Sequence, residues 1–128
     1  MSENKIYVID HAVYFDPEIW GAKFWFAIES VLLSCDISDV ESVENTYLFL
    51  ISLQHTIPCP TCRKHYQHYI KYNDIQELFE SKRKMFFWLY KLQNKIKKKV
   101  KKKPFPSFRD YLRVVKNKFD LREDEMKL

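Results

Sequence analysis

Apolar residues recur at helical spacing along most of the chain. Over residues 17–34, and again over 39–56, apolar side chains return every three or four positions, which is the pattern of an amphipathic helix. Asp16 suits the N-cap of the first segment, and Ser38 and Glu41 have the spacing of a capping box for the second. The pattern therefore predicts two long helices in the first half of the chain.

Prolines divide the second half into further helices. Pro58 ends the second helix, and Pro60 suits the first turn of the next one. Pro104 and Pro106 break a long amphipathic segment that is rich in lysine. The predicted elements are a third helix over 60–72, a short turn over 74–80, a fourth helix over 82–102 and a shorter fifth helix over 107–119.

Alternation of apolar and polar residues with period two is nearly absent, and only "KIYVI", residues 5–9, suggests a few residues of strand. The predicted fold class is all-α, a four-helix bundle with an additional short C-terminal helix. We expect a single domain over 1–128 with its core over about 16–118, so that 1–15 and 119–128 are terminal extensions.

Composition narrows the function classes. Aromatic residues make up 16% of the 128-residue chain, which predicts a core rich in rings. Gly21 is the only glycine, which excludes the glycine-rich loops that hold dinucleotides or phosphates in many folds. The most apolar window, "FWFAIESVLLSC", is too short to span a bilayer, and the start of the chain does not resemble a secretory signal. We therefore expect a cytoplasmic protein without a membrane span.

The stretch "IPCPTCRKH", residues 57–65, carries the candidate chemistry. The prolines around Cys59 place its sulfur at the amino end of the third helix, where unpaired backbone N–H groups favour a thiolate. Cys62 lies one helical turn further on. This geometry predicts that Cys59 is the more exposed sulfur and exchanges with a substrate, whereas Cys62 faces the interior.

Other interpretations of the same residues stay open. Zinc could be bound by Cys59 and Cys62 together with two of three histidines, which are His55, His65 and His68. The cysteines, Cys35 included, could instead be inert core thiols of a noncatalytic interaction protein. The run over 95–103 holds seven lysines and could bind nucleic acid nonspecifically, cover a solvated helix face or bind an anion.

Three sequence blocks in fixed order resemble the Erv/ALR family of FAD-linked sulfhydryl oxidases. "WGAKFW" over 20–25 is similar to the family pattern W-G-x-x-x-W-x-x-L-H, and the C-x-x-C pair follows. "WLYKLQNKIKKKVKKKPF" over 88–105 is similar to the pattern W-L-C-x-x-H-N-x-V-N-x-x-L-x-K-P-x-F. The resemblance spans about residues 16–112, and compact members from poxviruses and other large DNA viruses are the most similar in kind.

The chain departs from the family pattern at identifiable positions. Glu29 and Gln93 stand where the family has histidines, and Lys97 replaces its second asparagine. Tyr90 replaces the cysteine of the family's structural disulfide, so the resemblance implies that this bridge is absent. The changes affect flavin contacts and leave the redox pair intact.

The resemblance implies an FAD-dependent thiol oxidase in which Cys59 and Cys62 are catalytic. Electrons would pass from a protein dithiol through this pair to FAD and then to O2, giving H2O2, with no metal. The implied partner is a small CxxC or CxxxC thiol carrier, and the implied oligomer is a homodimer. The viral likeness implies disulfide formation in virion proteins within the host cytoplasm or the virion, with no specific nucleic acid.

FAD is expected within the bundle, between aromatic rings such as those of Phe24, Trp25, Tyr66 and Trp88. Trp25 is the strongest candidate for a ring contact and Lys102 for the diphosphate. The expected cofactor-binding residues are Gly21, Trp25, Glu29, His65, Gln93, Asn94, Ile96, Lys97, Lys102 and Phe105.

Overall fold

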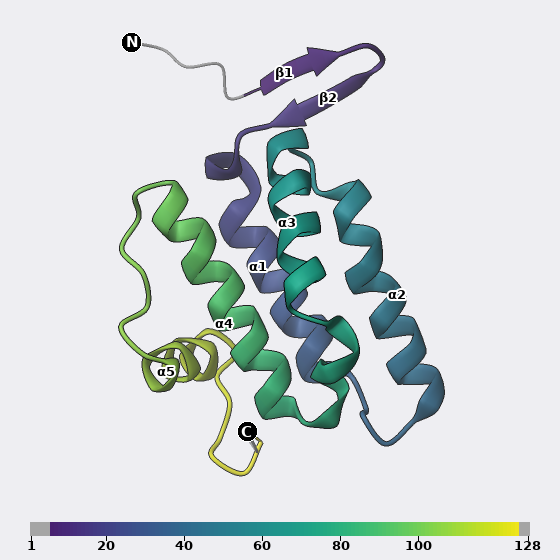
Figure 1. Cartoon of the computed structure of the whole chain (residues 1–128). Coiled ribbons are helices and arrows are strands. Elements are labelled where there is room, and N and C mark those ends of the chain that lie inside the picture. The colour runs from purple at the N-terminus through teal and green to yellow at the C-terminus, as the bar shows by residue number, and fades with distance from the viewer. Residues whose placement is uncertain (1–5, 126–128) are drawn as a thin grey trace.

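The computed structural model describes residues 6–125, and its helices confirm the all-α prediction. The four long helices lie side by side, and the last, shorter helix lies against the outside of the one before it (Figure 1). The helical elements are α1 (Pro17–Ser34), α2 (Val40–Thr56), α3 (Pro60–Tyr72), the 3₁₀ helix η1 (Ile75–Glu80), α4 (Lys82–Lys99) and α5 (Phe108–Lys118). The outermost parts of the two predicted extensions, 1–5 and 126–128, lie outside the described residues.

A β-hairpin precedes the bundle, which the sequence pattern did not predict beyond a few strand residues. Strands β1 (Ile6–Ile9) and β2 (Ala12–Phe15) pair antiparallel through a turn in which Asp10 has a φ of 54°. Aspartate is one of the few residue types other than glycine that tolerates this left-handed conformation. The hairpin lies across the end of the bundle where α1 and α3 begin (Figure 1).

The start of α2 and the end of α4 differ from the predicted positions. The capping box at Ser38 is wrong: Asp39 is the N-cap of α2 without a side-chain cap bond, and the Ser38 hydroxyl donates to Asp36 instead. Helix α4 ends three residues before the predicted position 102 because Lys101 adopts a φ of 58°. The Lys102 N–H then donates to the Lys97 carbonyl, as in a Schellman motif.

The core lies between the four long helices and extends under α5. Leu32 of α1, Leu50 of α2 and Leu89 of α4 are fully buried there, and Tyr111 of α5 reaches the same core. At the far end of α1, the Lys82 ammonium donates to the carbonyls of two residues in the last turn of that helix, 2.5 and 2.9 Å away. A cation at a helix C-terminus stabilises these unpaired carbonyls, so α4 is fastened to α1 at that end.

Within residues 6–125 no helix is both long and apolar enough to cross a membrane. Cys35, the third cysteine, is buried at the C-cap of α1.

Candidate functional site

A disulfide between Cys59 and Cys62 stands at the first turn of α3. Cys59 is the N-cap of this helix, and its sulfur accepts a hydrogen bond from the Cys62 backbone N–H at 3.2 Å. Pro60 occupies the first helical position, where its missing N–H costs no hydrogen bond. The two Cα atoms are 5.2 Å apart, within the ordinary range for a disulfide. The predicted placement of Cys59 at a helix amino end is therefore confirmed.

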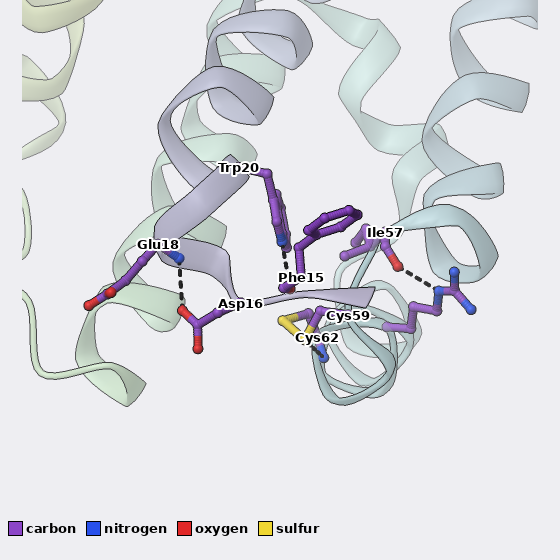
Figure 2. Close-up of a disulfide and its surroundings, with 8 residues drawn as sticks. Phe15, Asp16, Glu18, Trp20, Ile57, Cys59 and Cys62 are labelled. Atoms are coloured by element: carbon purple, nitrogen blue, oxygen red, sulfur yellow. Dashed lines mark hydrogen bonds between the residues drawn. A yellow bond between two sulfur atoms is a disulfide. The ribbon is translucent and has the colours of Figure 1, made fainter. Parts of the chain in front are cut away.

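The predicted difference in exposure between the two cysteines is wrong. Cys59 is only 5% exposed, whereas Cys62 is partly exposed. Two features cover Cys59: its side chain turns back over the first turn of α3, and the end of β2 lies beside it (Figure 2). Because the sequence did not reveal the hairpin, it could not reveal this cover.

Hydrogen bonds attach the hairpin to the disulfide segment. The Phe15 N–H donates to the Pro58 carbonyl, and the Trp20 indole N–H donates to the Phe15 carbonyl, both at 2.9 Å. On the other side, the Arg63 side chain donates to the Ile57 carbonyl at 2.6 Å, and its guanidinium lies 5.3 Å from the centre of the Tyr14 ring. Figure 2 shows the Trp20–Phe15 bond on one side of the disulfide and the bond to the Ile57 carbonyl on the other. The segment before the redox pair is thus attached to the hairpin by one backbone hydrogen bond, and side chains of α1 and α3 add a bond on each side of it.

The disulfide opens onto an apolar cavity of about 350 Å³ between α1, α3 and α4. Aromatic rings and aliphatic side chains form most of its wall. Among its lining residues are Tyr7, Trp20, Gly21, Phe24, Trp25, Cys59, Cys62, His65, Tyr66 and Ile96. A volume of this size and an aromatic lining are typical of sites for flat organic molecules.

A second hollow, of about 770 Å³, lies between α1, the end of α4 and α5. Four lysines line it, which are Lys23, Lys97, Lys102 and Lys118, and the last three act on one another electrostatically. Burial lowers the pKa of Lys97, and the positive charges of Lys102 and Lys118 lower it further. Its ammonium also lies 3.7 Å from the centre of the Phe105 ring. Since the three cations repel one another, an anion bound between them would be stabilised.

The cavity and the hollow share part of their walls. Gly21, Trp25 and Ile96 line both, together with two residues at the ends of α1 and α4, Pro17 and Val100. A Cβ atom added at Gly21 would meet no heavy atom within 4 Å, so this position faces open space. The site is therefore continuous: aromatic and apolar beside the disulfide, and cationic further along α4.

Glu29 and Gln93, which stand at the two histidine positions of the family pattern, meet in a buried polar cluster. One Glu29 oxygen accepts from the Tyr111 hydroxyl at 2.6 Å and from the Gln93 amide at 3.3 Å, and the other accepts from the Lys118 ammonium at 2.5 Å. The Gln93 amide also donates to the Tyr111 oxygen at 3.1 Å. Glu29 is fully buried and lines neither hollow, whereas Gln93 and Lys118 line the cationic one.

Two other predicted residues also lie away from both hollows. The Asn94 amide donates to the Phe105 carbonyl at 3.1 Å and accepts from its N–H at 2.8 Å, so its role here is to hold Phe105 against α4. Trp88, expected in the flavin wall, is instead a core residue whose indole donates to the Asn73 carbonyl. The remaining expected residues line one or both hollows: Gly21, Trp25, Cys59, Cys62, His65, Gln93, Ile96, Lys97, Lys102 and Phe105.

Sequence reasoning missed residues that enter the site from outside the three family blocks. Tyr7 belongs to the unpredicted hairpin, and Tyr111 and Lys118 belong to α5. Lys118 carried no distinguishing signal, because it is one of 22 lysines and arginines in the chain. The aromatic positions of α5 at helical spacing could have indicated that this helix packs onto the bundle.

His65 lines the apolar cavity one turn beyond Cys62. Burial lowers its pKa, and the charges of Lys99 and Lys95 lower it further, which favours the neutral imidazole at pH 7. Within residues 6–125, no three histidine, cysteine, aspartate or glutamate side chains come together in a way that could hold a metal ion. The zinc alternative therefore finds no ligand set in the described part of the chain.

The chain matches the model of the Erv1 / Alr family over residues 23–120. This match covers most of the chain and includes the redox pair and the cationic end of α4. The chain therefore belongs to the Erv1 / Alr family.

Two curated relatives extend this finding. The putative FAD-linked sulfhydryl oxidase 096R of Invertebrate iridescent virus 3 is 25% identical over 88 residues, covering 68% of this chain and 60% of the relative. The mitochondrial FAD-linked sulfhydryl oxidase ERV1 of Saccharomyces cerevisiae is 30% identical over 91 residues, covering 70% of this chain and 47% of the relative. The chain thus spans about half of the length of these proteins. No solved structure matches it.

Proposed function

We propose that the protein is an FAD-dependent thiol oxidase that forms disulfide bonds in protein dithiols. The observation that carries the proposal is the Cys59–Cys62 disulfide, which opens onto an aromatic cavity that continues into a lysine-lined hollow. Membership of the Erv1 / Alr family and the names of the two relatives support the same activity.

The residues present fit FAD. The aromatic cavity beside the disulfide matches a flat ring system, and the hollow with Lys97, Lys102 and Lys118 matches an anionic diphosphate. Trp25 and Ile96 lie where the two parts join, and Gly21 leaves room between them. When bound, FAD supplies a two-electron acceptor that can pass electrons to O2, with H2O2 as the expected product.

The chain's own chemistry is thiol–disulfide exchange. A substrate thiolate attacks the Cys59 sulfur, the Cys59–Cys62 bond breaks, and Cys62 leaves as a thiolate that faces the cavity. A second substrate thiolate attacks the substrate sulfur of the mixed disulfide and releases Cys59. The substrate loses two electrons and gains a disulfide, and the enzyme pair gains them. The Cys62 N–H and the amino end of α3 stabilise the released Cys59 thiolate.

Cys59 is assigned as the point of attack although it is the less exposed of the two sulfurs. It is the N-cap of α3, so the amino end of this helix and the Cys62 N–H favour its release as a thiolate when the mixed disulfide is resolved. Cys62 lies on the helix itself and shares the cavity wall with His65 and Tyr66, which follow it by three and four residues. Burial raises the pKa of the Tyr66 phenol, whose hydroxyl donates to the Leu50 carbonyl, so this wall carries no charge from Tyr66.

The finer assignments rest on family likeness. The similarity to an iridescent virus protein supports a viral role in which the enzyme oxidises virion proteins in the host cytoplasm. A small CxxC or CxxxC protein is proposed as the thiol carrier and a homodimer as the oligomer.

Oxygen uptake with reduced dithiothreitol tests the activity directly. We expect one H2O2 to appear and one dithiol to be oxidised for each O2 consumed, because the cycle moves two electrons. Dithiol oxidation that proceeds equally without the protein, or without FAD, would refute the proposal.

Gly21→Ala separates folding stability from cofactor binding. Since an added Cβ meets no atom and alanine favours a helix interior, we expect the protein without FAD to gain about 0.5–1 kcal/mol of unfolding free energy. The methyl group projects into space shared by both hollows, so FAD should bind at least about tenfold more weakly. Thermal unfolding and flavin fluorescence titration measure the two effects. A variant that binds FAD as tightly as the parent would show that Gly21 does not border the cofactor.

A further inference from the structure

The hairpin has an open backbone edge beside the redox pair. In a two-residue hairpin with this register, Ile9 and Ala12 form a hydrogen-bonded pair, and such pairs alternate with non-hydrogen-bonded pairs along the strands. The Val8–Val13 pair is therefore of the second type, so the N–H and C=O groups of both residues point away from the partner strand. On β2, the N–H and C=O groups of Val13 point to the same edge of the hairpin as those of Phe15, which lies two residues further along the strand.

Part of that edge is already used by the disulfide segment. The Phe15 N–H donates to the Pro58 carbonyl, and the Phe15 carbonyl accepts from the Trp20 indole. Pro58 thus stands in the position of a third strand beside the end of β2, directly before Cys59. Among the described residues none hydrogen-bonds to Val13 on this edge, and its side chain is 50% exposed. The third-strand position is filled at Phe15 and open at Val13.

We propose that this open edge of β2 binds an extended segment of the dithiol substrate, which pairs with the Val13 backbone and brings its cysteine to Cys59. The inference rests on the proposed function and adds the binding mode of the substrate. A strand paired at Val13 would lie two residues, or about 6–7 Å, from the strand position that Pro58 occupies. Main-chain pairing requires an extended backbone and tolerates many side chains, so it would position the substrate cysteine without requiring a particular sequence around it.

Two further observations favour this occupant. In Figure 1, β2 lies nearer the helices than β1, so its outer edge faces the redox pair and the outer edge of β1 faces away. The face of the hairpin that carries Ile6, Val8 and Val13 is exposed and β-branched, which favours cross-strand packing with an added strand. A segment added there ends beside a disulfide, and the chemistry that a disulfide offers an incoming strand is exchange with a thiolate.

Val13→Pro removes the backbone N–H that would donate to a carbonyl of the substrate segment. Val8→Pro is the matched control, because it removes the corresponding N–H on the opposite edge of the hairpin. Both positions belong to one non-hydrogen-bonded pair, so neither proline deletes a bond between β1 and β2. The probes are a reduced synthetic peptide with a Cys-Ala-Ala-Cys pair between Thr and Val residues, and dithiothreitol, which has no backbone. We expect Val13→Pro to lower kcat/KM for the peptide about fivefold or more, with dithiothreitol oxidation unchanged and with Val8→Pro close to the parent for both.

The outcomes distinguish this inference from the proposed function. If the parent protein does not oxidise dithiothreitol, the proposed thiol oxidase activity is refuted. Normal dithiothreitol oxidation with equal peptide kinetics in the two proline variants would refute edge binding alone.

A second measurement does not depend on how proline affects the hairpin. In Cys62→Ser, the Cys59 thiolate can open the disulfide of the oxidised form of this peptide and stay joined to one of its sulfurs as a mixed disulfide, while the other peptide sulfur leaves as a thiolate. Amide hydrogen exchange of Val13 should then slow about tenfold or more relative to the free variant, with the Val8 amide unchanged. Unchanged exchange at Val13 would overturn the proposal, and protection of Val13 in the free protein that grows with protein concentration would assign the edge to a second copy of the chain.

Discussion

Cys62→Ser is expected to reduce dithiol oxidation to the uncatalysed rate. Without the Cys62 sulfur no disulfide can form at the start of α3, so the enzyme has no oxidising group to offer a substrate. Oxygen uptake with dithiothreitol measures the loss. Cys35→Ser is the matched control, because this third cysteine is buried at the end of α1 and is not bonded to the pair.

Cys59→Ser should be equally inactive, and the two variants should differ in what they trap. Cys62→Ser retains the sulfur that we assign to exchange, so it should accumulate a mixed disulfide with an oxidised peptide probe. Cys59→Ser should accumulate much less, since its remaining thiol lies within α3 and lacks the N-cap hydrogen bond that favours a thiolate at Cys59. Turnover that survives in Cys59→Ser, or a mixed disulfide that forms mainly in that variant, would reverse the assigned roles.

Loss of the buried Glu29 carboxylate should have the largest effect on stability. Glu29→Leu leaves the Tyr111 hydroxyl, the Gln93 amide and the Lys118 ammonium without their shared acceptor. Removing one member of a buried ion pair typically costs about 3–5 kcal/mol. We expect a loss of this size in the free energy of unfolding, measured by urea denaturation, with α5 losing its main polar attachment to α1.

Two lysines on α5 provide the control for this prediction. Lys118→Met leaves the Glu29 carboxylate buried without a cation. It should lower the free energy of unfolding by about 3 kcal/mol or more. Lys116→Met removes an ion pair with Glu123, whose side chain is 88% exposed, and should change stability by less than about 1 kcal/mol. If the two methionine variants unfold at the same urea concentration, the cluster does not hold α5 in place.

The helices could be predicted because their signals are local. The sequence predicts helices over 17–34 and 60–72, which form α1 and α3, because a proline in the first turn marks the start of each. The hairpin could not be predicted in full, because each strand has four residues and apolar side chains on both faces. Such short segments lack the alternation that distinguishes a strand.

Some residues of the site could be predicted from the sequence, and others could be found only from the fold. The redox pair could be assigned from the spacing of its two cysteines, and most of the lining from the resemblance of the three blocks to the Erv/ALR family. The cluster around Glu29 joins residues up to 89 positions apart, and no local pattern records such a contact. Substitution of both family histidines drew attention to positions 29 and 93, but only the fold showed that α5 supplies their partners. The cover over Cys59 likewise depends on a hairpin whose last residue, Phe15, lies far before it in the chain.

The visible spectrum of the purified protein tests the central claim most directly. After incubation with excess FAD and gel filtration, the protein should be yellow, carry about one FAD for each chain, and lose its absorbance near 450 nm, roughly the flavin band, when dithiothreitol is added without oxygen. Cys62→Ser should bind FAD and keep its colour under the same treatment. A colourless preparation that contains stoichiometric zinc, or a bound flavin that the dithiol bleaches equally in Cys62→Ser, would contradict an oxidase that works through this pair.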